Sequence, residues 1–558
     1  MSWIAALALG CHAPTSATGG PSSTDDATDG PIGSWTQPTS PTTDGSTGGV
    51  DTAATTTTTP PAVDVPFEQR AIYLVMPDRF ANGDPTNDGL GVPNCVDPAN
   101  PVLFHGGDWL GLEQHLDYLE ELGVDAVWIT PPYQQVPPTV TSCGYHGYWG
   151  DFADPDDGAV EPKLGTVDDL ASLADALHAR GMVLVLDLVP NHSGRGSRIL
   201  AQHPDWFHDD ADCAGSDQPD IDCSLNGLPD FDQELPEVDA YLRAQSVGWV
   251  ERARADAIRI DTVKHVPPDW LGGSWLPEVT DGGARFAVGE IFDEGGYDRI
   301  EDYVDAGLPS AFDFPLRRAL VDAVAHGGSI DLVASRVAEA VDRFGIDQAN
   351  RMVHLVDNHD VQRFTEDVLH RPDEEATGRY RMALAILTTA PGIPQLQWGD
   401  ELGMRGGNDP DNRRDLPAWA FDPATRTGDP DGFLPDVGGT FDATRALLAL
   451  RKAHPALTVG GYTELWRYNN HGAQVWAYFR SSGEDRVIVA IHAGTGASGP
   501  LSIKIQENPG LDAVDLAAMP DGVALTPILS TSPARIEGGK LVIDDLPPLT
   551  ATAWVVGP

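Results

Sequence analysis

Basic residues are scarce in this chain of 558 residues, which has 35 Lys and Arg against 84 Asp and Glu. The formal net charge of -49 at pH 7 repels nucleic acid phosphates and anionic membrane surfaces, so we expect no nucleic acid partner. A neutral polymer or a cation is a more natural partner. Solubility alone also accounts for such a charge, which therefore excludes partners without naming one.

Long hydrophobic runs are also missing. No segment approaches the roughly 20 apolar residues that a membrane-spanning helix needs. The opening MSWIAALALGC resembles an export signal that ends at a lipid-modified Cys11, although no basic residues precede its short apolar run. We therefore expect an extracellular or cell-envelope protein, attached to a membrane only through a lipid on Cys11.

Cysteine is sparse, and no Cys-x-x-Cys occurs, so zinc binding and dithiol redox chemistry are not expected. Setting Cys11 aside leaves Cys95, Cys143, Cys213 and Cys223, an even number in a chain with an export signal. Disulfides are stable outside the cytosol, and four cysteines allow three pairings. The short separation favours a bond between Cys213 and Cys223, with Cys95 and Cys143 as the remaining pair.

The N-terminal 64 residues differ in composition from the rest of the chain. From His12 to about Val65 they are almost wholly Thr, Ser, Gly, Pro, Asp and Ala, and cannot bury enough apolar surface to fold. We expect residues 1–64 to be an export signal followed by a disordered tether.

Beyond the tether, helical patterns alternate with short apolar strands. Four leucines at helical spacing precede Gly123 and the apolar run 126–129. A helix capped by Thr166 leads in the same way to a strand at 182–187, and another strand ends at Asp261. Such alternation over about 330 residues favours the α/β class, and within it a closed (β/α)8 TIM barrel over an open sheet.

Two segments depart from this rhythm. Residues 193–236 are rich in turn residues and show little periodicity, which indicates a small subdomain inserted after the third strand. From residue 454 to 558 short alternating segments indicate a C-terminal antiparallel β-sandwich. The barrel is then expected in 65–192 and 237–453.

Polar residues that a buried strand would not otherwise choose follow four of the expected strands. They form the motifs Asp187-Leu-Val-Pro-Asn191-His192, Arg259-Ile-Asp261-Thr-Val-Lys264-His265, Gly289-Glu290 and Asp357-Asn358-His359-Asp360. In order, spacing and co-occurrence these motifs resemble the alpha-amylase family of retaining glycoside hydrolases. The resemblance covers about residues 68 to 558.

The resemblance implies three catalytic carboxyl groups. Asp261 would attack the anomeric carbon, and Arg259 would keep it ionised and oriented. Glu290 would act as acid and then as base, which requires a raised pKa. Asp360 would hold sugar hydroxyls as the ring flattens, in a contact that strengthens in the transition state.

The resemblance also implies further contacts to an α-glucan substrate. In Tyr145-His146-Gly147-Tyr148-Trp149 the ring of Tyr148 would stack on the scissile glucose and His146 would touch it. The remaining substrate contacts implied by the matched motifs are His192, His359, Lys264, Asp409 and Arg413. Outside these motifs, each histidine would more readily be interpreted as a core residue.

Calcium is the one cofactor that the resemblance implies, and no organic cofactor is expected. Asn191, Asp230 and the carbonyl of His265 match a calcium site that joins the inserted subdomain to the barrel. A second cluster resembles a site of the cyclodextrin-forming branch, and an Asx-rich turn explains it almost as well: Asn82, Asp84, Asn87, Asp88, Gly106 and Asp108.

The leading interpretation is a secreted, monomeric alpha-amylase that hydrolyses internal α-1,4 bonds of starch, glycogen or maltooligosaccharides. A cyclodextrin glucanotransferase is the main alternative, but Asn226 stands where that branch has an aromatic residue, and the chain is expected to lack its extra domains. A cyclomaltodextrinase would carry an N-terminal β-domain and would lack Lys264-His265. An inactive glucan-binding protein would have lost a catalytic carboxylate, and none is lost here.

Overall fold

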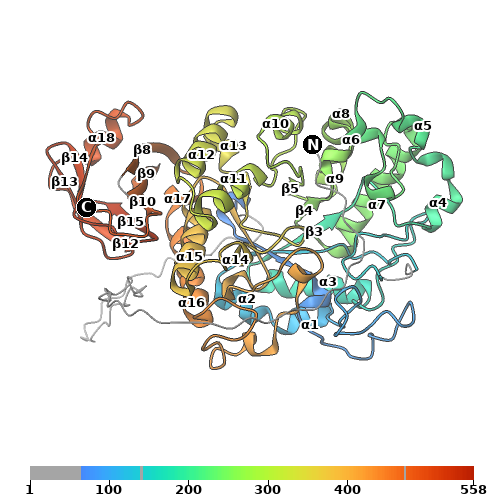
Figure 1. The fold of residues 1–558 in the computed structure, drawn as a ribbon. Helices are drawn as coiled ribbons and strands as arrows, with labels where there is room; N and C mark the ends of the chain where they lie inside the picture. The colour runs from blue at the N-terminus through green and yellow to red at the C-terminus, as the bar shows by residue number, and fades with distance from the viewer. Residues whose placement is uncertain (1–64, 138–141, 471–472, 558) are drawn as a thin grey trace, which may run out of the picture.

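The computed structural model describes residues 65–137, 142–470 and 473–557. Cys11 and the predicted tether lie outside this part of the chain. Figure 1 shows the barrel in the middle, the C-terminal β-domain at one end and helices α4 to α6 at the other. In the described part of the chain, no helix combines the length and the apolar character needed to cross a membrane.

Seven short strands form one parallel sheet in the order β5-β4-β3-β2-β1-β7-β6. Their residues are buried throughout, as in parallel sheets that are covered on both faces. The strands are β1 (Ile72–Val75), β2 (Ala126–Ile129), β3 (Val183–Leu188), β4 (Ala257–Ile260), β5 (Phe286–Gly289), β6 (Val353–His354) and β7 (Ile393–Gln397).

A short extended segment closes this sheet into a ring. Ala311 pairs in parallel with Gly289 at the end of β5, and Phe312 pairs in parallel with Val353 in β6. The segment takes the sixth place in chain order, so eight extended segments surround the barrel axis. The predicted TIM barrel is confirmed.

Helices and glycine turns connect the strands as the sequence predicts. Thr166 caps the third helix by accepting from the amide of Asp169, whose carboxylate accepts from the amide of Thr166. The helices of the barrel are α1 (Trp109–Gln114), α2 (Leu116–Leu122), α3 (Val167–Ala179), α7 (Pro236–Ala253), α8 (Pro268–Trp270), α9 (Leu276–Asp281), α10 (Asp298–Asp305), α11 (Phe314–Leu320), α12 (Asp331–Phe344), α13 (Ile346–Ala349), α14 (Phe364–Asp367), α15 (Asp373–Thr389), α16 (Val437–Ala453) and α17 (Pro455–Thr458).

Between β3 and α7 the chain forms a loop-rich excursion with three short helices, α4 (Arg198–Gln202), α5 (Asp210–Cys213) and α6 (Pro219–Asp222). A disulfide joins Cys213 to Cys223 across α5 and α6. A second disulfide joins Cys95 to Cys143 in the loops around β2. Both expected pairings are therefore confirmed.

The C-terminal part contains one five-stranded and one three-stranded antiparallel sheet. Leu465, Phe479, Ile503 and Leu541 belong to a separate apolar core shared by the two sheets. The other face of the larger sheet packs on the barrel, where Tyr478 and Thr389 share a hydrogen bond of 2.6 Å. The elements are β8 (Gly461–Asn470), β9 (Ala473–Ser482), β10 (Asp485–His492), β11 (Leu501–Lys504), α18 (Ala513–Ala518), β12 (Leu525–Leu529), β13 (Ala534–Glu537), β14 (Lys540–Ile543) and β15 (Thr550–Val556).

Candidate active site

The predicted carboxylates follow three strands of the barrel, of which β4 and β5 are adjacent. Asp261 follows β4 directly, Glu290 follows β5, and Asp360 comes six residues after β6. All three therefore lie at the carboxyl ends of the parallel strands, where barrel enzymes place their chemistry. The amides of Asp261 and Glu290 donate to the carbonyls of the neighbouring strands, at Leu188 and Ile260, which fixes both residues to the barrel rim.

Arg259 contacts the carboxyl groups of both Asp261 and Glu290. Its Nη1 lies 2.6 Å from Oδ1 of Asp261, and its Nη2 lies 2.8 Å from Oε2 of Glu290. The guanidinium is fully buried, so both contacts are shielded from water. The contact to Asp261 is a charge-assisted hydrogen bond, whereas the contact to Glu290 is a close approach without hydrogen-bond geometry. Because one small planar group contacts both, the two carboxyl groups lie side by side.

Burial distinguishes Glu290 from an ordinary surface glutamate. Desolvation raises the pKa of Glu290 to about 8, against the opposing effect of Arg259 and with support from the negative charges of Asp360 and Asp261. At pH 7 Glu290 therefore holds a proton. A protonated carboxyl beside Asp261, which accepts from Arg259, can deliver a proton to one side of a bond while Asp261 attacks the other.

Asp187 was part of a motif but was not predicted as a site residue. Its carboxylate accepts from Arg259 at 2.9 Å, from Nε1 of Trp128 at 3.0 Å and from the hydroxyl of Tyr148 at 2.8 Å. Burial raises the pKa of Asp187 to about 7, although Arg259 opposes the shift. An aspartate inside a fully buried strand was the signal in the sequence, since such a residue needs polar partners.

Four rings lie close to these carboxylates and to one another. Tyr148 stacks on His359 with ring centroids 5.2 Å apart. The ring centroid of His146 lies 5.8 Å from that of Tyr148, with 21° between the two ring planes. The ring of His192 lies 4.0 Å from Asp261 through Nε2 and contacts the carbonyl of Tyr148. Burial lowers the pKa values of all three histidines, to about 3 for His359, so they present neutral imidazoles.

Asp360 has a different environment from Glu290. Its carboxylate lies 3.2 Å from His359 and 3.1 Å from Nη2 of Arg413, and its side chain is 37% exposed. Burial would raise the pKa of Asp360, but His359, Arg413 and Arg259 outweigh burial and lower it. Arg413 also pairs with Asp409 at 3.2 Å, so the structure brings these three predicted residues together.

Asn412, next to Arg413, was not predicted as a site residue. Its amide nitrogen donates to the carbonyls of His359 and Val361, and the side chain is fully buried. Arg413 donates from Nε to the same carbonyl of His359. The segment after β7 thus holds the segment after β6, and the sequence gives no pattern that would single out Asn412.

Lys264 and His265 occupy the turn after Asp261, within the short helix η6 (Val263–His265). The amide of Lys264 donates to the carbonyl of Glu290 at 3.4 Å. The side chains of both residues turn to Asp220 in the excursion after β3. The backbone bond to Glu290 places this turn next to Glu290, on the side of β5 away from β6 and Asp360.

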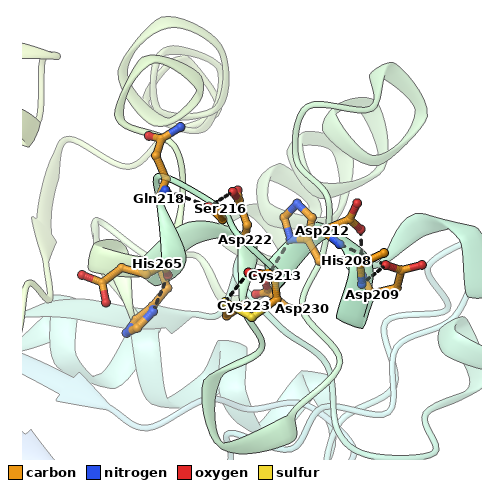
Figure 2. Close-up of a disulfide and its surroundings, with 12 residues drawn as sticks. His208, Asp209, Asp212, Cys213, Ser216, Gln218, Asp222, Cys223, Asp230 and His265 are labelled. Carbon is orange, nitrogen blue, oxygen red and sulfur yellow. Dashed lines mark hydrogen bonds and ion pairs between the residues drawn. A yellow bond between two sulfur atoms is a disulfide. The ribbon is translucent and has the colours of Figure 1, made fainter.

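The first predicted calcium site has oxygen atoms that suit a cation. Within the described residues, Oδ1 of Asn191 and Oδ1 of Asp230 are buried without a hydrogen-bond partner. Buried oxygen atoms that lack a hydrogen-bond partner are hard donors that fit Ca²⁺. The other oxygen of Asp230 accepts from His208 at 2.9 Å. In the described part of the chain, no hydrogen bond or ion pair joins His265 to Asn191 or to Asp230. Figure 2 shows His265 and Asp230 in the surroundings of the Cys213–Cys223 bond.

The second predicted cluster also comes together. Asn82 donates to Asp88 at 3.0 Å and Asn87 donates to Asp108 at 3.1 Å. Gly106 has φ +95°, and a Cβ there would lie 2.8 Å from both Asn82 and Asp88. The amides of Gly83 and Asp84 donate to the carboxylate of Asp108, which also caps α1, so hydrogen bonds to the chain already occupy Asp108.

Among the residues that the structure describes, no group of three or more His, Cys, Asp or Glu is arranged to hold a metal ion. Either calcium site would therefore depend on amide and carbonyl oxygens in addition to carboxylates.

Comparison with known proteins gives consistent matches. Residues 74–222 match the model of the alpha amylase catalytic domain. The Beta/alpha-amylase of Paenibacillus polymyxa is 29% identical over 88% of this chain, and the cyclomaltodextrin glucanotransferase of Niallia circulans is 28% identical over 78%. The chain spans 38% and 60% of these two relatives.

Among solved structures, an Anoxybacillus alpha-amylase superposes with a TM-score of 0.74 and 29% identity. The match covers 89% of this chain and 99% of that one. A match over 89% of this chain is too long to be confined to the barrel, so it includes at least part of the C-terminal sheets.

Proposed function

From the premise that this chain belongs to the alpha-amylase family, we propose that it hydrolyses α-1,4-glucosidic bonds within starch-like glucans, with retention of configuration. The observation that carries this proposal is the single buried guanidinium of Arg259, which contacts Asp261 at 2.6 Å and Glu290 at 2.8 Å. Retaining glycosidases need their two carboxyl groups roughly 5 to 5.5 Å apart, whereas inverting enzymes leave a wider gap for water. Carboxyl groups that share one guanidinium suit the narrower arrangement.

The first chemical step uses both groups. Asp261 attacks the anomeric carbon and forms a covalent glycosyl ester as the glycosidic C–O bond breaks. Glu290 transfers its proton to the departing oxygen, which leaves Glu290 ionised. Its raised pKa of about 8 ensures that the proton is present at neutral pH before the step.

The second step reverses these roles. Ionised Glu290 takes a proton from water, the water oxygen attacks the anomeric carbon, and the ester bond to Asp261 breaks. Asp360, held ionised by the positive charge of Arg413 at 3.1 Å, accepts hydrogen bonds from sugar hydroxyls as the ring flattens. The rings of Tyr148 and His359 supply apolar faces for the sugar.

Transfer to a sugar hydroxyl is the second candidate, because the relative from Niallia circulans is a cyclomaltodextrin glucanotransferase. The chemical groups are the same, and only the acceptor in the second step differs. Asn226 favours water, because this exposed position carries an amide instead of the aromatic ring of the transferase branch.

Calcium is proposed as a structural ion. Asn191 and Asp230 would hold it between the excursion and the barrel, and it would supply a fixed positive charge without taking part in bond cleavage. We also propose export from the cytosol, which two disulfides in the described part of the chain support.

The test uses residues 65–558 with amylose and maltoheptaose in calcium buffer. Reducing ends and product sizes are followed together. A rapid rise in reducing ends with short linear products supports hydrolysis. Cyclic or longer products with few new reducing ends would make the protein a transferase, and no turnover would overturn both.

A further inference from the structure

The Cys213–Cys223 bond closes a ten-residue loop that reaches the turn after Asp261. Inside the loop, Ser216 donates to Asp222, and the amide of Gln218 donates to the hydroxyl of Ser216 at 2.7 Å. Figure 2 shows this loop with the disulfide at its base, His265 on one side and His208 with Asp209 on the other. The loop is thus a self-contained unit on the rim of the barrel.

Asp220 is the residue of this loop that contacts the site. Its main-chain carbonyl lies 2.6 Å from Nδ1 of His265, and its carboxylate lies 3.5 Å from Nζ of Lys264. Arg299 of α10 faces the same carboxylate at 4.0 Å. Asp220 therefore contacts two consecutive residues of the turn that begins at Asp261.

A partly exposed ion pair of this kind adds little to stability. Lys264 has 27% of its side chain exposed and Asp220 has 45%, so solvent screens their attraction. What the contact does restrict is the direction of a long, flexible side chain, since an unpaired lysine would sample many rotamers. The effect is expected in substrate binding rather than in folding.

The order of the strands decides which part of a substrate this turn faces. Asp360, Asp409 and Arg413 follow β6 and β7, whereas Lys264 follows β4 and bonds through its amide to the carbonyl of Glu290. Glu290 protonates the departing oxygen in the proposed reaction. The turn that carries Lys264 lies on the side of Glu290 away from Asp360, and it therefore faces the departing sugar chain.

We propose that Asp220, fixed on the loop closed by Cys213–Cys223, is a positioning residue that directs Lys264 and His265 toward the sugars of the leaving group. This inference rests on the proposed function. Asp220 acts through Lys264 and His265 and touches no reacting atom. The disulfide holds the loop beside the turn that follows Asp261, so Asp220 and the two cysteines act together.

Asp220→Asn tests the carboxylate, because it removes the pairing with Lys264 and keeps the main-chain carbonyl that faces His265. Two substrates distinguish effects on the leaving-group side of the cleft from effects on the whole site. Maltoheptaose has sugars on the leaving side, whereas α-maltotriosyl fluoride has only a fluoride ion there. The expected result is a three- to tenfold rise in KM for maltoheptaose with kcat within twofold, and less than a twofold change in kcat/KM for the fluoride.

Asp217→Asn is the matched control, since Asp217 is an exposed acid three residues earlier on the same loop. It should match the unaltered protein on both substrates. Cys213→Ser with Cys223→Ser should reproduce the effect of Asp220→Asn and exceed it, because the carbonyl contact to His265 is released as well. Melting temperatures in saturating calcium verify that each variant is folded.

Equal losses on both substrates would overturn the inference, because the residue would then serve the whole site. An unchanged KM for maltoheptaose in Asp220→Asn would also overturn it. If the unaltered protein turns over neither substrate, the proposed function fails instead, so the two failures are distinguishable.

Discussion

Two carboxyl groups that share one arginine have to differ in charge for the proposed reaction to run. Both residues are buried, and burial raises the pKa of Glu290 to about 8. Asp261 accepts from Arg259 at 2.6 Å and from the hydroxyl of Thr262 at 3.2 Å. Hydrogen bonds to the charged form stabilise a carboxylate, and burial without enough of them stabilises the acid. Local environment thus assigns the two roles.

Glu290→Gln should separate binding from turnover. The amide keeps the shape of the side chain but cannot donate a proton, so kcat on maltoheptaose should fall by about 10² to 10⁴-fold. Affinity for the glucan should stay within a fewfold, as measured by calorimetry. Glu251→Gln, at an exposed glutamate on α7, is the control. Substantial cleavage by the Glu290 variant would show that another group is the acid.

The pH dependence of kcat/KM reports groups of the free enzyme. Glu290 has its pKa raised to about 8, so its acid form is present below that pH and disappears above it. Activity on maltoheptaose should therefore decline above about pH 8, tenfold per pH unit. A glycosyl fluoride needs little protonation, and its alkaline decline should be weaker. Identical profiles for both substrates would contradict the assignment.

Among the elements, the loop that carries the aromatic residues is held by a disulfide. Cys143 comes two residues before Tyr145, and its bond to Cys95 joins this loop to the segment that leads to His105. Tyr145 lies between Arg79, at 4.1 Å from its ring centroid, and Arg413, which donates to its hydroxyl at 3.2 Å. The position of His146 and Tyr148 therefore depends on both loops.

Replacing Cys95 and Cys143 together by serine should lower both stability and affinity. The two cysteines are 48 residues apart, against 10 for Cys213 and Cys223. The chain-entropy relation then gives about 4 kcal/mol for the longer loop and about 2.7 kcal/mol for the shorter one. Calorimetry should show the larger drop in melting temperature for the Cys95–Cys143 variant. The reverse order would contradict this account.

At the scale of the whole molecule, the barrel lies between two additions. The C-terminal sheets attach through apolar packing and hydrogen bonds, such as the one from Arg480 to Asn350 at 2.9 Å. The excursion after β3 attaches near the site through bonds such as the one from the amide of Phe231 to the carbonyl of Asn191 at 2.9 Å, and the side-chain Oδ1 atoms of Asn191 and Asp230 are buried there without a hydrogen-bond partner. A cation bound by these two oxygens would add to the attachment of the excursion.

Removal of calcium should accordingly lower the melting temperature. A ligand that binds only the folded protein at 100 times its Kd contributes about 2.7 kcal/mol to stability. Scanning calorimetry with EDTA and with calcium measures the difference. Asp230→Asn should abolish this difference in melting temperature if the first site binds calcium. Asp84→Asn should reduce the difference if the second site binds calcium. An identical melting temperature in EDTA and calcium would count against both sites.

The order of elements could be predicted from the sequence because local patterns encode it. Leucine spacing and Gly123 identified the first helix and the strand after it, although the structure divides that helix into α1 and α2 at His115. Asp261, Glu290 and Asp360 were predicted from the order, spacing and co-occurrence of the strand-end motifs, which together resemble those of the alpha-amylase family. The pairing of Cys213 with Cys223 followed from the short distance along the chain.

Only the tertiary structure decided which residues support the site. Asn412 and Asp220 act through contacts with residues that are 53 and 45 positions away, and no local pattern encodes such a contact. The closing segment at 311–312 is too short to be recognised as a strand, and only its two neighbours define it. The pKa of Glu290 is likewise a property of the packed barrel, because its burial and the charges around it come from separate strands.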